Sequence, residues 1–233
     1  MNTNVNLAAP VGVMALLGTG FIIFAAALFL IQSLVVRRFG RAKVILVAML
    51  VIGGVYLAAI LAFSFAAHDK LLARGEEKHF CEIDCHLAYS VTNVRQAKTL
   101  GDPPNQETAQ GAYWIVTIKT RFDETTIGPR RGNGVLYPNS RVLTLLDERG
   151  NKYAPAAANE RAFSTAQSSS TPLTTALRPG ESYTTDVIFD LPSDVKTATL
   201  FVNEGDWITH FIIGHENSLW HGMTKFQLGA LSL

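Results

Sequence analysis

The stretch Arg37-Arg-Phe-Gly-Arg-Ala-Lys43 decides the architecture of this 233-residue chain, because it separates two long apolar segments that carry no charge. Val11–Val36 lies before it and Val44–Ala67 follows it. About 20 apolar residues are enough to cross the ~30 Å hydrocarbon core of a bilayer, and neither segment keeps the polar stripe of a soluble core helix. The sequence therefore predicts a transmembrane hairpin, with helices at about 11–36 and 44–67 and a loop at 37–43.

The orientation of this hairpin follows from its charges. Four of the seven loop residues are cationic, and short cationic loops stay on the cytoplasmic side of a membrane. The leader before Val11 has no Lys or Arg, and the first apolar segment is longer than the core of a cleaved signal peptide. We therefore expect a bacterial inner (plasma) membrane protein with two spans, whose N-terminus and C-terminal domain are both periplasmic.

Composition excludes several classes of protein. Residues 1–67 contain no Asp or Glu, whereas residues 68–233 contain all 19 acidic residues and carry a net charge of −3. This split argues against a single soluble domain, a disordered chain, a disulfide-dense mini-protein and a basic nucleic-acid-binding protein. Neither apolar segment contains an ionisable side chain, which argues against a transporter, a proton channel or an intramembrane enzyme.

Small residues recur every four positions in the second apolar segment, at Gly54, Ala58, Ala62 and Ala66. This spacing places them on one helix face, where another helix can approach closely. Two interpretations remain open at this point: the two predicted spans pack on each other through this face, or the face docks onto a larger membrane complex.

The remainder of the chain has the pattern of a β domain. Residues 68–80 are expected to continue the second helix and then form a juxtamembrane linker, and residues 81–233 to form an all-β extracytoplasmic domain. Strands are predicted at Cys85–Val91, Ala112–Phe122, Val142–Leu146, Lys152–Tyr153, Tyr183–Leu191, Thr197–Val202, Trp207–Ile213 and Met223–Leu231. Short strands separated by turn signals favour an antiparallel β-sandwich.

Three short motifs support a family resemblance. They are Asp147-x-x-Gly-x-x-Tyr153, Leu177-x-Pro-Gly-Glu181 and Val187-x-Phe-x-Leu-Pro192, which follow the apolar strand Tyr113–Thr120. In this order they resemble the immunoglobulin-like, telokin-like sandwich of uncharacterised function found on bacterial lipoproteins and membrane-anchored proteins. The resemblance covers roughly residues 80–231 and implies a fold without general catalytic residues. The two predicted spans are a departure from it, because a lipidated cysteine or a single span is more usual in that family.

The two cysteines stand in the segment His79-Phe-Cys-Glu-Ile-Asp-Cys-His86. A disulfide between Cys81 and Cys85 would need a turn between them, because their Cα atoms would be ~13 Å apart on one continuous strand. Two unpaired cysteines are a further possibility. Cys81, Cys85 and His86 also resemble a lengthened covalent haem c motif, and two thiolates with an imidazole suit Cu(I). Thiol–disulfide exchange is disfavoured, since the spacing is not Cys-x-x-Cys.

Exposed aromatic and cationic side chains suggest a surface for a partner. His215–His221 is predicted to form a solvent-facing turn before the last strand, because its two histidines lack the spacing of a metalloprotease helix. Trp220 in that turn, with Tyr113 and Trp114, is a candidate anchor for a partner. Arg130 and Arg131 in a glycine-rich loop are candidates for contact with an anion or a partner.

These observations favour a non-catalytic membrane protein without a cofactor. We expect a scaffold or accessory subunit whose partners are the lipid bilayer and other subunits of a membrane complex, by analogy with those of respiratory or photosynthetic complexes. The alternative is an electron-transfer or metal-handling protein that uses Cys81, Cys85 and His86 to hold haem c or copper.

Overall fold

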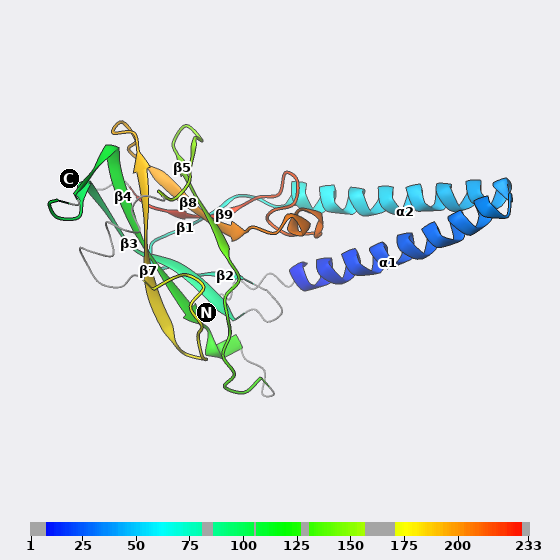
Figure 1. Ribbon diagram of the computed structural model, residues 1–233, viewed down its shortest axis with the longest axis horizontal. Helices are drawn as coiled ribbons and strands as arrows, with labels where there is room; N and C mark the ends of the chain where they lie inside the picture. Colours follow the sequence, from blue (N-terminus) through cyan, green and yellow to red (C-terminus); the bar gives the residue numbers. More distant parts are fainter. Residues whose placement is uncertain (1–7, 81–85, 105, 127–130, 157–170, 230–233) are drawn as a thin grey trace. The chain divides into compact units, whose positions relative to one another are not determined.

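The computed structural model describes residues 8–80, 86–104, 106–126, 131–156 and 171–229 (Figure 1). The chain divides into two compact units. One unit consists of Asn6–Asp69 together with Asp206–Met223, and the other of Lys70–Gly205 together with the chain from Thr224 onward. The expected division into a hairpin, a linker and a continuous β domain from residue 81 therefore needs correction, because Asp206–Met223 groups with the helices.

The first unit is built on two long antiparallel helices, α1 (Ala8–Val35) and α2 (Phe39–Ala66). Both are long and apolar enough to cross a membrane. The chain reverses between them with Arg37 in the left-handed region, at φ 57°. The connection is shorter than the expected loop 37–43, because α2 begins at Phe39 and already includes Arg41 and Lys43.

The helices meet along seams in which the less exposed residues recur every three or four positions. In α1 the less exposed residues include Leu16, Thr19, Ile23, Ala26, Leu30 and Ser33. In α2 they include Ala42, Ile45, Met49, Ile52, Tyr56, Ile60 and Ser64. Alternate spacings of three and four are the pattern of coiled-coil packing. In α1, small residues at a spacing of seven alternate with larger ones, so the two helices can lie close together.

The second unit contains two sheets. The five-stranded sheet has the spatial order β1 (Lys70–Leu72), β9 (Thr224–Gln227), β8 (Ala198–Glu204), β5 (Arg141–Asp147) and β6 (Lys152–Tyr153). The four-stranded sheet has the order β2 (Lys78–Phe80), β3 (Leu87–Leu100), β4 (Glu107–Phe122) and β7 (Ser182–Leu191). Neighbouring strands are antiparallel except β1 and β9, which are parallel. A short 3-10 helix, η1 (Glu124–Thr126), follows β4.

Both sheets contribute to one hydrophobic core. Strand β4 illustrates why: Trp114, Val116 and Ile118 alternate onto the core face, as the sequence predicted, and all three are buried. Leu145 of β5 and Leu200 of β8 bring the five-stranded sheet to the same core. The opposite face of the four-stranded sheet carries a smaller buried cluster, made of Leu100, Ala109, Tyr113, Ile115 and Ile188.

The structure corrects two predictions of secondary structure. The segment after α2 does not continue as a helix. Its Lys70–Leu72 forms β1 beside β9, with the Leu72 side chain in the core. The predicted strand Trp207–Ile213 is instead the 3-10 helix η2 (Trp207–Phe211). Its aromatic and β-branched residues favour a strand intrinsically, but Thr209 bonds back to the Asp206 carbonyl through both its amide and its hydroxyl.

Candidate functional site

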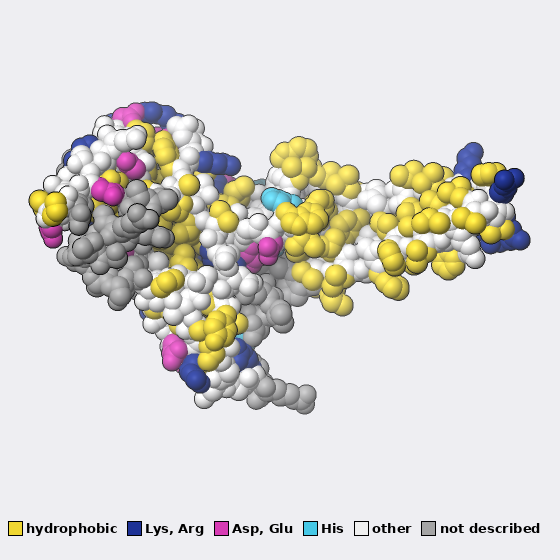
Figure 2. Space-filling view, viewed as in Figure 1, with side chains coloured by type: hydrophobic (Ala, Val, Ile, Leu, Met, Phe, Trp, Pro, Cys, Tyr) yellow, Lys and Arg dark blue, Asp and Glu magenta, His cyan; other side chains and the backbone are white. Residues whose placement is uncertain are grey.

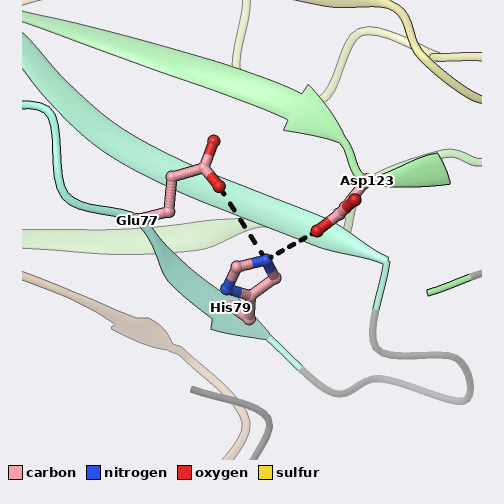
Figure 3. A group of neighbouring side chains, drawn as sticks. All are labelled: Glu77, His79 and Asp123. Carbon is pink, nitrogen blue, oxygen red and sulfur yellow. Dashed lines mark hydrogen bonds and ion pairs between the residues drawn. The ribbon is translucent and has the colours of Figure 1, made fainter. Parts of the chain in front are cut away.

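A compact group of titratable side chains lies on the four-stranded sheet: Glu77, His79, Arg121 and Asp123. Figure 3 shows Glu77, His79 and Asp123 of this group. Strand β2 supplies His79, and Glu77 immediately precedes that strand. In the register of the sheet, His79 pairs with Ala88 of β3, and Ala88 pairs with Arg121 of β4. Residues in one such row share a face, so the register brings together side chains that are far apart in sequence.

Hydrogen bonds and ion pairs hold this group tightly. Arg121 donates to both carboxylate oxygens of Glu77, from Nε at 2.8 Å and from Nη2 at 2.7 Å. The same Nη2 lies 3.2 Å from Oδ2 of Asp123. His79 Nε2 lies 3.1 Å from that carboxylate and acts as the donor, because an ionised carboxylate only accepts hydrogen bonds. The backbone amide and the hydroxyl of Thr125 donate to the other oxygen of Asp123.

These contacts shift the pKa values of Glu77, Arg121 and Asp123 in the direction that favours the charged form of each side chain. Burial acts to raise the pKa of Asp123, but hydrogen bonds from Thr125, Arg121 and His79 outweigh it and leave that pKa well below its ordinary value. The hydrogen bond from Arg121 likewise lowers the pKa of Glu77, against the effect of burial. The pKa of Arg121 is raised, chiefly by its hydrogen bond to Glu77. Glu77, Arg121 and Asp123 are therefore charged at neutral pH.

Glu77, His79 and Asp123 have ligand atoms within 4.8 Å of one another, which is the arrangement of a possible metal site. However, Arg121 already bonds both carboxylates from the centre of the group. A divalent cation would have to displace this guanidinium or share the carboxylates with it at the cost of repulsion. The donor set therefore fits an internal ion-pair network better than a metal centre.

The cysteine hypotheses fall only partly within the described structure. Cys81 and Cys85 lie outside the described residues, so the disulfide, the free thiols, and haem or copper ligation all stay predictions. His86 is described: it is buried, its ring stacks on Phe122 at 5.4 Å, and its carbonyl accepts the amide of Asp123. His86, just before β3, is thus in direct contact with Asp123 of the ion-pair network.

The candidate partner surface does not form as one patch. Tyr113 and Trp114 are both buried, because β4 is the central partner of β3 and β7 and both of its faces are covered at this point. Their assignment to an exposed surface was wrong. Arg130 lies outside the described residues. Arg131 donates to the Gly134 carbonyl and lies over the Phe122 ring, whereas Trp220 is exposed.

The small-residue face of α2 is exposed and turned away from α1. At 100° per residue, Gly54, Ala58, Ala62 and Ala66 lie on roughly the opposite side of the helix from the seam. The interpretation that the two spans pack on each other through this face is therefore wrong. The seam instead uses α2 positions with larger side chains, which fit against the small residues of α1.

Sequence reasoning missed two buried cations in the β domain. Lys78 Nζ donates to the carbonyls of Val202 at 2.6 Å and Thr224 at 3.1 Å. This side chain of the four-stranded sheet is therefore hydrogen-bonded to the five-stranded sheet. Arg141 lies 4.1 Å above the Phe80 ring and pairs with Glu204 at 3.4 Å. Alternation could have revealed both, because each begins a strand on the core face.

The motifs behind the family resemblance make turns. Asp147 accepts the amides of Arg149 and Asn151 and the hydroxyl of Tyr153, which closes the β5–β6 hairpin around Gly150 at φ +81°. Within Leu177–Glu181, Gly180 is also left-handed, and the Glu181 carboxylate accepts the amide of Arg178. These residues explain local structure and supply no reactive group.

Comparison with known proteins gives no family assignment. No model of a protein family matches the chain, and no curated protein matches it. Three solved structures show limited similarity. A conserved hypothetical protein from Bacillus anthracis is 13% identical with a TM-score of 0.43, covering 57% of this chain and 91% of that one. The secreted protein MPT63 from Mycobacterium tuberculosis is 14% identical with a TM-score of 0.42, covering 69% and 98%. The yjhA protein from Bacillus subtilis is 13% identical with a TM-score of 0.40, covering 68% and 99%.

Proposed function

We propose that this protein is a non-catalytic scaffold or accessory subunit of a larger membrane complex in a bacterial inner membrane. The observation that carries the proposal is the exposed face of Gly54, Ala58, Ala62 and Ala66, which the seam between the helices leaves uncovered. Small side chains let a neighbouring helix approach closely, so this face suits a helix of another subunit.

Membrane insertion of the helix pair is supported by its surface. Large apolar side chains are exposed along both helices, among them Phe21 and Phe29 of α1 and Leu50 and Phe63 of α2. Water solvates such a surface poorly, whereas lipid covers it without cost. Lys and Arg side chains gather at the tip where α1 joins α2 (Figure 2), which favours a cytoplasmic tip. The N-terminus and the β domain are then periplasmic.

The β domain serves in this proposal as a rigid periplasmic module. Its two sheets share a core, and we propose that they form an immunoglobulin-like, telokin-like sandwich, on the strength of the turn motifs around Asp147 and Leu177–Glu181. The ion-pair network of Glu77, Arg121 and Asp123 is consistent with a structural role, because Arg121 bridges the two carboxylates.

The test is co-purification from the native membrane after mild detergent extraction, with identification of the accompanying chains. Gly54→Leu places a large side chain on the small-residue face and is expected to release the partner. Gly20→Leu is the matched control: Gly20 is also an exposed helical glycine, and a Cβ at either position meets no atom within 4 Å. If the wild-type protein migrates alone, or if both variants keep the partner equally, the proposal fails.

An absorption spectrum of the same purified protein separates the proposal from the electron-transfer alternative. A Soret band or a copper charge-transfer band would assign Cys81, Cys85 and His86 to a cofactor and overturn the non-catalytic scaffold. We expect neither band.

A further inference from the structure

Residues Asp206–Met223 form a continuous series of turns that leaves the β domain and joins the helical unit. The hydrogen bonds repeat every three residues: the amides of Thr209, Ile212, His215, Ser218 and His221 donate to the carbonyls of Asp206, Thr209, Ile212, His215 and Ser218 in turn. We call these residues the turn segment. The repeat gives this irregular stretch of backbone a defined, self-bonded shape.

The turn segment is docked on the ends of both helices. On α1, Gly12 lies so close to the carbonyl of Ile213 that a Cβ would overlap it. On α2, the Tyr56 hydroxyl donates to the Phe211 carbonyl at 2.8 Å. Tyr56 is ten residues before Ala66, which corresponds to about 15 Å along the helix. The turn segment therefore lies beside the C-terminal part of α2 rather than beyond its end.

The second half of the turn segment also contacts α2 and the chain just after it. The Trp220 ring stacks on Phe65 of α2 with 5.7 Å between ring centroids. Trp220 adopts φ 60°, a left-handed conformation that is unfavourable for a large side chain. Next to it, Gly222 touches the backbone of His68 at a point where no side chain would fit. An outlier of this kind persists when surrounding contacts over-determine it.

The turn segment exposes several large apolar side chains, beside the exposed polar residues Asp206 and His210. The exposed residues of the turn segment include Trp207, Ile208, Phe211, Leu219 and Trp220, and the two tryptophans are 73% and 65% exposed. In Figure 2, hydrophobic side chains form a broad cover over the helices and over this segment beside them. This apolar surface is therefore continuous with the helix surface for which lipid is the proposed solvent.

Several polar side chains of the turn segment form hydrogen bonds within it. The hydroxyl of Ser218 donates to the Ile212 carbonyl at 2.6 Å, and the Asn217 side chain donates to the Thr209 hydroxyl at 2.9 Å. His210 Nδ1 bonds the carbonyl of Asn217. Irregular backbone that faces lipid does not occur within the hydrocarbon region, so a segment of this kind is expected at the level of the lipid headgroups. Tryptophan side chains concentrate where the hydrocarbon meets the lipid headgroups.

We propose that the turn segment is a second membrane contact, a re-entrant wedge that inserts Trp207, Phe211 and Trp220 into the lipid interface beside the helix pair. This inference rests on the proposed membrane insertion of α1 and α2. It adds a contact with the bilayer at a point 140 residues beyond α2 in the sequence.

The experiment places the full chain in phosphatidylcholine vesicles that contain lipids brominated along the acyl chain, and measures quenching of tryptophan fluorescence. The chain has three tryptophans, and Trp114 is buried in the β core. We expect shallow bromines to quench the wild-type emission strongly. Trp207→Phe and Trp220→Phe should each lose part of this quenching. The double variant, which reports Trp114 alone, should lose nearly all of it.

Failure of this inference can be told apart from failure of membrane insertion. Flotation with the vesicles after an alkaline carbonate wash reports whether the helix pair spans the bilayer. If the protein floats but Trp207 and Trp220 are no better quenched than Trp114, the wedge is refuted and the membrane anchor stands. If the protein does not float, both proposals fall. Phe variants keep aromatic bulk, and near-ultraviolet circular dichroism of the double variant confirms that Trp114 remains packed.

Discussion

Replacement of Arg121 by Met tests whether the guanidinium stabilises the neighbouring carboxylates of Glu77 and Asp123. The change leaves Glu77 and Asp123 as neighbouring carboxylates without their shared cation. Removal of one partner from a buried ion pair costs about 3–5 kcal/mol. The Asp123 side chain is only 5% exposed, but Arg121 and Glu77 are 26% and 28% exposed. Solvent therefore lowers the expected loss to about 2–3 kcal/mol. This predicts a Tm lower by about 4–12 °C for a domain of this size.

The measurement is thermal unfolding of the purified full chain in mild detergent, followed by near-ultraviolet circular dichroism. Arg149→Met is the matched control: Arg149 pairs with Asp194 at 2.6 Å, but both side chains are more than half exposed. An exposed pair contributes little, so this variant should melt close to the wild type. If Arg121→Met and Arg149→Met melt alike, the argument from burial is refuted.

Low pH and added metal ions should each change the difference in stability between the wild type and Arg121→Met. The pKa values of Glu77 and Asp123 are lowered in the folded protein, so their stabilising contribution is complete at neutral pH. It is lost as the pH falls through and below their ordinary range of about 4. The gap between the wild type and Arg121→Met should therefore narrow in acid. Added Mn²⁺ should stabilise Arg121→Met through Glu77, His79 and Asp123, and leave the wild type unchanged. Stabilisation of the wild type by Mn²⁺ would contradict the assignment of this site as a closed ion-pair network.

Three further variants test the β domain. Lys78→Met should lower the Tm and cost about 1–3 kcal/mol, because two core carbonyls lose a charged donor; an unchanged melt would show that the bridge between the sheets is dispensable. Gly111→Ala should also destabilise, since its Cβ would overlap the Leu191 carbonyl where β4 meets β7, and an unshifted melting curve would contradict that close approach. Asp147→Asn should loosen the β5–β6 turn, seen as faster amide hydrogen exchange at Asn151; unchanged protection would mean that the turn holds without this carboxylate.

Much of the β domain was predictable because its residues alternate. Trp114, Val116 and Ile118 identify the core face of β4 from the sequence alone, and Asp147 with Gly150 marks the hairpin. In both cases the determinants lie within a few residues of one another. Local patterns of this kind are the information that a single sequence carries most directly.

The ion-pair network was not predictable for the opposite reason. Glu77 and Asp123 meet only through the register of β2 on β3 and of β3 on β4. A shift of one residue in either pairing would turn Arg121 or His79 to the other face. The sequence offers no local signal that fixes those two registers, so it draws attention to the nearby cysteines and histidines instead.

In α2, the spacing of small residues does not identify the face that packs on α1. Gly54 and Ala58 have the spacing of a helix-packing face, yet the seam is formed by positions such as Tyr56 and Ile60. In α1 the small residues that permit this packing recur every seven positions, as Thr19, Ala26 and Ser33. The face with four-residue spacing in α2 stays exposed, because the seam lies on the other side of the helix.

The conformation of the turn segment depends both on its local sequence and on contacts with residues far away in the sequence. Strands β8 and β9 pair as neighbours, with Leu200 opposite Phe226, yet 18 residues between them leave the sheet. Neighbouring antiparallel strands need only a short turn, and connections longer than about 12–15 residues usually have a function of their own. The aromatic residues of this connection predicted a strand, because β-propensity depends on residue type and does not indicate where a segment packs. Contacts with Gly12, Tyr56 and Phe65 determine its conformation, and all three lie in the helices, more than 140 residues earlier. The lipid interface proposed for the turn segment would account for two exposed tryptophans on a connection of this length.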